Sequence, residues 1–393
     1  MQLARGFVIF WSLLWVSGSS LPARAASEPV EYTVSATEDG PAQPVEDPRL
    51  SVGIRFLDPA IPDQDAQSLE DEGIFPAVRK SESRHFAVRL REALAASDTW
   101  RKVQVVPEDA PADLTLHGKI LRSNGTHLTL RVWLVDASGR TGFKRRYRAR
   151  VDPEYYDVLA TVEREESGAV SGPFGTLYDQ VANDLEKWYL KRSARELREL
   201  RWITRLKLGE DLAPMAFQGF LESGKSGDLT LARLPAEGDP LLASLRRLEN
   251  AHDQFLDTVT VYQAAFSDRF YDFYEVWQRA SFENWLALKE KHKERMQALP
   301  SPWDPDAEMT GGRFRPEPRT RNFITRSPIP AAVQEHEQIE RALGSDLDHQ
   351  VEPMLIEVEG QTLRLQGTLE AQYATWRRLL RELFAAETGG TLR

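Results

Sequence analysis

The sequence predicts an α+β protein: an N-terminal β-α-β-β-β-α domain with an antiparallel meander, then a mainly helical domain with long coiled-coil-like helices, and a C-terminal β-hairpin plus helix. Three observations support this class. Apolar residues alternate over residues 114–150, as in strands that bury one face. Residues 241–299 contain neither Gly nor Pro and repeat apolar side chains at helical spacing. Residues 354–388 show a second alternation followed by a second helical repeat.

The first 25 residues have the three parts of a secretory signal peptide. Arg5 gives a positive start, Phe7–Val16 is an apolar stretch, and Ala23-Arg24-Ala25 is a small-x-small cleavage pattern. We expect cleavage after Ala25 and a periplasmic protein. The alternative is an uncleaved membrane anchor, but the apolar stretch is about half of the ~20 residues that a spanning helix needs.

Composition narrows the choice of partners. The full chain carries a net charge of −10 and no cysteine. Residues 1–25 hold two arginines and no acid, so the mature chain would carry −12. This acidity argues against nucleic acid as a partner. The lack of cysteine excludes disulfides, thiolate metal sites, a cysteine nucleophile and a lipid-acceptor cysteine. No later stretch reaches 18 consecutive apolar residues, so we expect no stable membrane insertion after cleavage.

Changes in composition divide the mature chain into five parts. Residues 26–49 are an acidic leader with few large apolar side chains, which predicts disorder. Residues 50–206 form the α/β domain, and residues 207–300 the helical domain with a long helix or a helical hairpin. Residues 301–330 are an extended strap, since their many prolines and arginines suit neither helix nor central strand. Residues 331–393 hold a helix, a β-hairpin and a C-terminal helix that packs on the helical domain.

The α/β domain starts with a strand and a helix. Val52, Ile54 and Phe56 alternate along the strand, and His85 opens a helix with apolar residues at helical spacing. The apolar residues of this helix are Phe86, Leu90 and Leu94.

The hairpin that follows keeps its apolar residues on even positions on both sides of Ser123-Asn124-Gly125. A three-residue loop with left-handed Gly125 and a bulge keeps even opposite even. This register pairs Arg122 with Thr126 and Leu116 with Val132. Residues 136–139 form a second turn, after which residues 141–151 return as a third antiparallel strand.

A helical stripe starts at Phe174 and continues through Trp188 into residues 191–209. This last segment is rich in basic residues, and Arg195, Arg198 and Arg205 are a candidate interaction surface. A solvated helix face with interleaved acids also explains the charges, and we favour that interpretation.

Residues 241–299 predict either one helix of about 90 Å or a helical hairpin hinged at Ser267-Asp268. Their first half carries a seam at 3.5-residue spacing. Beyond it, the aromatic side chains occupy more of the helix surface than one such stripe. They form either core, which we favour, or a candidate interaction or ligand-binding surface. The candidates are Phe270, Tyr274, Trp277 and Trp285.

The C-terminal segment predicts a hairpin and a helix. The hairpin keeps its apolar residues on one face if Gly360-Gln361 form a two-residue turn. Thr368 caps the last helix, and the seam of this helix from Leu369 to Leu383 packs most simply on the seam that starts at Leu241.

One segment matches the phosphate-binding loop pattern GxxxxGK[ST] at every fixed position. A P-loop needs a buried strand before it and a helix after it. Here a short helix precedes the match, and Pro235 leaves little room for a following helix. We interpret the match as coincidental and the segment as a flexible interhelical loop, and we expect no cofactor. The matching residues are Gly219, Gly224, Lys225 and Ser226.

No constellation indicates catalysis or metal binding. The seven histidines show no HExxH or HxH spacing, and His252 occupies a seam position typical of a buried polar residue. There is no GxSxG motif. Carboxylate pairs such as Glu165-Glu166 are too frequent in an acidic chain to indicate catalysis. We therefore expect no catalytic residue and no metal.

Two motifs suggest a family. Residues 112–120, ADLTLHGKI, lead to a hairpin in which Val135-Asp136 is followed by Gly139. In these motifs the segment 50–206 resembles the small α/β domain shared by the N-terminal region of the Tol-system protein TolB and by outer-membrane lipoproteins that build curli pores or activate peptidoglycan synthases. The chain departs from that pattern in having no lipid-acceptor cysteine and no propeller repeat. The resemblance implies a noncatalytic, protein-binding envelope domain.

We therefore expect an exported noncatalytic envelope protein that acts as an interaction adaptor or accessory factor for an envelope protein partner. Two alternatives stay open. One is a cell-wall or polysaccharide hydrolase with paired carboxylates. The other is a periplasmic small-molecule or lipid binding protein with a cavity of ligand size.

Overall fold

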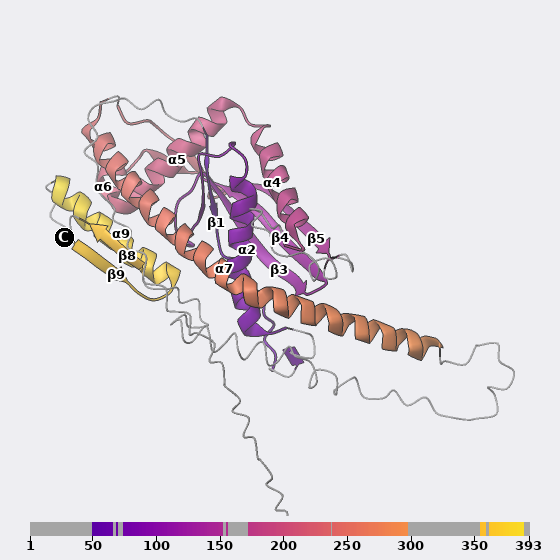
Figure 1. Cartoon of the computed structure of the whole chain (residues 1–393). Coiled ribbons are helices and arrows are strands. Elements are labelled where there is room, and N and C mark those ends of the chain that lie inside the picture. The colour runs from indigo at the N-terminus through magenta and orange to yellow at the C-terminus, as the bar shows by residue number, and fades with distance from the viewer. Residues whose placement is uncertain are drawn as a thin grey trace, which may run out of the picture.

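A mixed five-stranded sheet in the N-terminal part of the protein, combined with helices, confirms the α+β class (Figure 1). The computed structural model describes residues 49–65, 68–69, 74–151, 155, 172–236, 238–297, 354–358 and 361–388. The sheet has the order β2-β1-β3-β4-β5, with β1 parallel to both neighbours and the last three strands in an antiparallel meander. Its strands are β1 (Ser51–Ile54), β2 (Lys102–Val105), β3 (Leu114–Asn124), β4 (His127–Asp136) and β5 (Thr141–Arg150).

The predicted β-α-β-β-β-α order was wrong in one element, because it omitted β2. This edge strand has four residues, of which only Val103 and Val105 are apolar. Two apolar residues are too few to show an alternation in the sequence. The strand forms because its backbone pairs with β1 over its whole length.

Six helices are described, together with two small hairpins (Figure 1). The stripe from Phe174 to Trp188 does not continue into the basic segment as expected. The first helix ends at Tyr189. Ser193 and Glu196 then form a capping box that starts a new helix. The helices are α2 (Pro76–Ala95), α4 (Gly175–Tyr189), α5 (Ala194–Leu212), α6 (Pro214–Phe217), α7 (Pro240–Gln297) and α9 (Leu369–Thr388). The hairpins are β6 (Leu221–Ser223) with β7 (Leu229–Leu231), and β8 (Met354–Val358) with β9 (Gln361–Leu365).

The turn between β3 and β4 differs from the predicted three-residue loop. Asn124 pairs with His127 across a two-residue turn, and Leu116 pairs with Leu134 instead of Val132. A register shift between Ile120 and Arg122 restores even-opposite-even pairing farther along the strands. The predicted apolar face is therefore buried, although the register is shifted by two residues.

Gly125 allows the β3–β4 turn to approach the backbone of α7, and its φ is not left-handed as the predicted loop required. A Cβ at this position would lie 2.0 Å from the carbonyl oxygen of Gln278 and 2.8 Å from the Cβ of Ser281. Only glycine fits such a contact. The turn is thus fixed against the middle of α7.

The helix expected to open at His85 begins at Pro76 instead, with proline in the first turn. The residues from Arg79 to His85 are polar, so apolar periodicity does not reveal the first half of α2. Most of these side chains are nevertheless buried in the structure. They are Arg79, Ser81, Glu82, Ser83, Arg84 and His85.

A buried carboxylate connects α2, β3 and α7. Glu82 is 1% exposed and forms an ion pair of 3.0 Å with Arg79 Nε. Its carboxylate accepts hydrogen bonds from the hydroxyls of Tyr274, at 2.7 Å, and Ser123. Burial raises the pKa of Glu82, and the Arg79 guanidinium acts against that shift. This polar cluster aligns three elements that lie far apart in the sequence.

Two further polar contacts join α2 to α7. The Nε of Arg84 donates to Gln263 Oε1 at 3.1 Å, and its guanidinium lies 3.5 Å from the ring centre of Phe266. The Nδ1 of His85 is 2.7 Å from Ser267 Oγ. The α2–α7 interface is therefore specified by hydrogen bonds as well as by apolar packing.

The stretch 240–297 is one continuous helix of 58 residues, which decides between the rod and the hairpin. Its two halves enter different cores. Leu245, Phe255 and Val259 pack in a core with α5, α6 and α9. Phe270 and Tyr274 pack in the core beneath the sheet with α2 and α4. Figure 1 shows α7 crossing α2 and extending to the C-terminal elements at its other end.

The aromatic residues proposed as a candidate surface on α7 are core residues. Phe270, Tyr274 and Trp277 are each at most 3% exposed, and Tyr274 stacks on Trp277 with ring centres 5.4 Å apart. They are therefore not an interaction surface. The side chain of Trp285 lies outside the described residues.

The C-terminal helix packs on the first half of α7, as predicted. Phe255 stacks on Trp376 with ring centres 5.7 Å apart, and Thr368 Oγ1 accepts from the backbone of Ala371 as the expected cap. In the hairpin Val358 pairs with Gln361, so Gln361 belongs to β9 and not to the turn. The predicted signal peptide, acidic leader up to residue 48, strap and following helix lie outside the described residues. Among the described helices, none is long and apolar enough to cross a membrane.

Replacing Gly125 by alanine should destabilise the protein by about 2–3 kcal/mol, because the new Cβ would overlap the α7 backbone. Gly139→Ala is the matched control. Gly139 has a φ of +90°, but a Cβ at this position would meet no atom within 4 Å, so we expect a loss of about 1 kcal/mol from backbone strain alone. Urea unfolding of both variants measures the difference, and equal losses would contradict the close contact.

His85 should make the folded protein less stable on mild acidification. Burial is the main cause that lowers the pKa of His85, to about 3, and the nearby Arg89 adds to it. Below pH 6.5 the unfolded chain therefore binds a proton that the folded chain excludes, which destabilises the fold. We expect about 1 kcal/mol of this effect between pH 7.5 and pH 5.5. His85→Gln should flatten the dependence of the melting temperature on pH, and parallel profiles for both proteins would refute this role.

Candidate functional site

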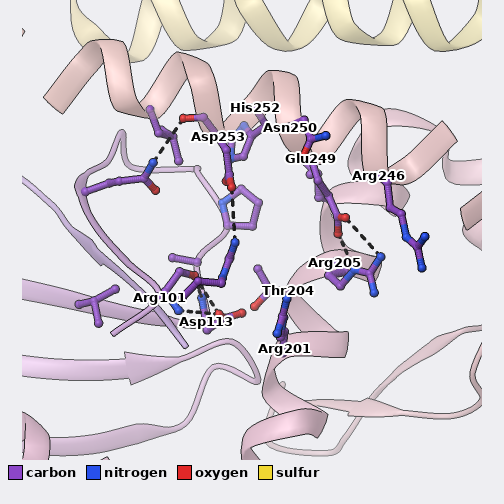
Figure 2. A pocket seen from close by; sticks show the side chains of 17 residues that line it. Arg101, Asp113, Arg201, Thr204, Arg205, Arg246, Glu249, Asn250, His252 and Asp253 are labelled. Atoms are coloured by element: carbon purple, nitrogen blue, oxygen red, sulfur yellow. Dashed lines mark hydrogen bonds and ion pairs between the residues drawn. The ribbon is translucent and has the colours of Figure 1, made fainter. Parts of the chain in front are cut away.

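A pocket of about 340 Å³ opens between α5, α7 and the start of the sheet (Figure 2). Its sheet side includes Arg101 beside β2 and Asp113 before β3. Its helix sides carry most of the remaining polar side chains. They are Arg201, Thr204 and Arg205 on α5, and Arg246, Glu249, Asn250, His252 and Asp253 on α7.

Helical spacing brings these side chains together. On α5, Arg201 and Arg205 are four residues apart, and on α7 Glu249 and Asp253 are also four apart, so successive turns face the pocket. Neighbouring positions on both helices are apolar and buried in the two cores, which fixes the rotation of each helix. These anchors include Ile203, Leu206, Leu245 and Leu248.

Each of the three carboxylates in the pocket is engaged. Asp113 Oδ2 accepts hydrogen bonds from the backbone N–H and the hydroxyl of Ser51 at 2.7 and 2.8 Å. Glu249 receives two bonds from Arg205, at 2.6 and 3.3 Å. Asp253 forms ion pairs with Arg101 at 3.5 Å and with Lys102 at 3.1 Å. Figure 2 shows these contacts, apart from that of Lys102, as dashed lines.

The Arg205–Glu249 pair is a rigid part of the wall. The two side chains are 12% and 22% exposed, and the Arg205 guanidinium also lies 4.5 Å from the ring centre of Trp202. Burial raises the pKa of the Glu249 carboxyl, and Arg205 acts in the opposite direction. The pair therefore holds its geometry through charge and stacking together.

Two arginines in the pocket have no such partner. Neither Arg201 nor Arg246 forms an ion pair with any residue in the part of the chain that the structure describes. Arg246 is exposed and Arg201 is partly buried. The pocket thus offers two guanidinium groups that no residue in the described part of the chain neutralises.

His252 adds a buried polar group to the same wall. Its side chain is 3% exposed, and both ring nitrogens lack a hydrogen-bond partner among the described residues. Burial lowers the pKa of His252 to about 4, against the influence of the nearby Asp253, so the imidazole is neutral at pH 7. A neutral imidazole offers one N–H donor and one acceptor. Each of these groups costs about 1–3 kcal/mol if it is left without a partner in a buried position.

This arrangement suits the binding of an anion. Guanidinium groups present planar sets of N–H donors that match a carboxylate or phosphate. The three carboxylates of the pocket are held by contacts within the protein, which leaves the guanidinium groups of Arg201 and Arg246 for a ligand. In the described residues, no three His, Asp or Glu side chains converge in a way that could hold a metal ion.

The P-loop-like residues lie elsewhere: Gly219 precedes β6, and Gly224, Lys225 and Ser226 lie in the turn between β6 and β7. The short helix α6 precedes them as expected, but the segment is a hairpin and not a flexible interhelical loop. The backbone N–H of Gly224 donates to the Asp228 carbonyl at 2.7 Å across its turn. A strand follows the match where a P-loop requires a helix.

The basic candidates on α5 are divided between two environments. Arg195 and Arg198 are exposed, whereas Arg205 is fixed in the pocket wall. Arg201 and Arg246 were not among the candidates. The four-residue spacing of Arg201 from Arg205 could have indicated Arg201, but that spacing is common on charged helices. The sequence holds no comparable signal for Arg246.

No family model, no curated protein and no solved structure matches this chain. The resemblance of residues 50–206 to the envelope domain stays a prediction. Function must therefore be inferred from the residues of the pocket and of the surface.

Arg205→Gln should destabilise the protein by about 2 kcal/mol at pH 7, because it leaves the partly buried Glu249 without its main countercharge. Adding Glu249→Gln should recover most of that loss, since the second change removes the unpaired charge. A double-mutant cycle by urea unfolding measures the coupling. Additive effects of the two changes would show that the pair does not act as a unit.

Proposed function

We propose that the protein is an exported, noncatalytic binding protein of the cell envelope that holds a small anionic ligand in the pocket between α5 and α7. The ligand bears a carboxylate or a phosphate group. The observation that carries this proposal is the pair of unneutralised arginines, Arg201 and Arg246, beside the buried and unpartnered His252.

The size of the pocket supports a small ligand. About 340 Å³ is near the lower end of the ~300–1,000 Å³ usual for ligand sites. The polar lining supports a hydrophilic ligand over a lipid, because charged residues on both helices line the space. The signal-peptide pattern of residues 1–25 supports the exported location.

The state of the carboxylates favours binding over hydrolysis. A glycosidase needs two carboxyl groups that can act on a substrate or water. Asp113, Glu249 and Asp253 are instead held by Ser51, Arg205 and the Arg101–Lys102 pair. The role as a protein adaptor, which the sequence favours, does not depend on this pocket.

Protein that begins at Ala26 should bind inorganic phosphate or succinate with saturation in calorimetric titrations at low salt. Arg201→Gln and Arg246→Gln should each weaken binding about tenfold, which corresponds to one charge-assisted contact of about 1.4 kcal/mol. Rising salt should weaken binding by the wild type more than binding by either variant.

Arg195→Gln is the matched control, because Arg195 lies exposed on the same helix and does not line the pocket. It should leave the affinity unchanged. Failure of both probes to bind, or an equal loss in this control, would contradict the pocket as the binding site.

A further inference from the structure

The strand β5 is an open edge of the sheet. It spans Thr141–Arg150, 10 residues, and within the described part of the chain it pairs only with β4. Within the described residues, no strand covers the backbone groups on its other side. A long open edge of this kind is a template for strand addition unless the protein protects it.

The side chains on the two faces of β5 differ in their contacts. On the inner face Asp184 of α4 accepts hydrogen bonds from Arg145 at 2.7 Å and from the Tyr147 hydroxyl at 2.8 Å. On the outer face Arg146 and Arg148 form no ion pair with any described residue. Helix α4 thus fixes the strand from one side and leaves alternate arginines free on the other.

The outer face places like charges directly opposite one another. Arg131 on β4 is the partner of both Lys119 on β3 and Arg146 on β5. Asp58 neutralises Lys119 at 2.7 Å, but Arg131 and Arg146 face each other, and no described carboxylate pairs with either. Such a pair destabilises a sheet. Its presence is explained if an external anion neutralises it.

A shallow depression of about 600 Å³ adjoins these arginines at the β3–β4 turn. Among the described residues its lining includes Arg122, Arg146, Arg148 and Arg150, together with His127, and no carboxylate. Arg122 is exposed and forms no ion pair among the described residues. The positive charge therefore extends from β5 across the outer face to β3, in a protein whose net charge is −10.

We propose that β5 binds an acidic, extended segment of a partner protein as an added strand. Asp or Glu at every second position of that segment would face Arg146 and Arg148, because side chains on one face of a strand recur with period two. The backbone edge supplies affinity, and the arginines select the sequence. This site is separate from the pocket and does not depend on the proposed anion ligand.

The charges also argue for this occupant over others. A second copy of the chain would bring β5 against β5 and place arginines opposite arginines. A nucleic acid could pair with the guanidinium groups, but it has no peptide backbone to complete the strand edge. An acidic peptide satisfies both features.

The test uses a fluorescent ten-residue peptide that alternates Glu with Val or Thr, added to protein that begins at Ala26. We expect saturable binding that weakens with salt. Arg146→Gln/Arg148→Gln should weaken binding at least tenfold, whereas Arg195→Gln/Arg198→Gln, on exposed positions of α5, should not. The same peptide with alternate backbone N-methyl groups keeps its charges but loses strand hydrogen bonds, and should bind at least tenfold more weakly.

Three outcomes would overturn the proposal. Equal binding of the N-methylated peptide, or of a single-stranded oligonucleotide, would reduce the site to a general anion surface. Absence of binding by the alternating peptide would remove it altogether. A tenfold gain in peptide affinity on deletion of residues 26–48 would assign the edge to the chain's own acidic leader instead of a partner protein.

Discussion

The placement of α7 against α2 and the β3–β4 turn is the constraint on which the other features depend. Tyr274 reaches the buried Glu82, and the backbone at Gln278 touches Gly125. A shift of α7 by one residue would remove the Tyr274 hydroxyl from the carboxylate and create a clash at the turn. The hydrogen bond between Tyr274 and the buried Glu82 thus sets the register of this helix, whereas apolar packing alone would tolerate small shifts. The same register places Arg246 and Glu249 opposite α5.

Much of the fold could be predicted from the sequence because apolar periodicity is strong in the meander, in α4 and in α9. The first half of α2 could not, because its partners lie far away in the chain. Glu82 bonds to Tyr274 and His85 to Ser267, at separations of 192 and 182 residues. The register of the hairpin was missed for a related reason. Gly125 is needed for its contact with α7, a role that a local turn pattern cannot reveal.

The candidate site was predictable only in part. Arg205 was among the candidates, but its partner Glu249 is 44 residues away, so the sequence alone could not separate paired from unpaired arginines. The unpaired ones, Arg201 and Arg246, matter most for the proposed function. For the aromatic cluster on α7, the sequence also allowed an interaction surface, but the structure buries Phe270, Tyr274 and Trp277 in the core. The sequence identifies charged and aromatic residues of this kind, but their role depends on which residues surround them in the folded protein.

Because α7 enters both cores, this protein is poorly suited to study in pieces. A fragment ending at residue 206 would contain the entire sheet, yet Phe86 and Glu82 would lose the aromatic layer that covers them. Water would then reach an apolar surface and a buried charge at once. Such a fragment would bind many proteins nonspecifically through that surface. Partners found with the isolated N-terminal half would therefore reflect the missing helix and not the biology of the whole chain.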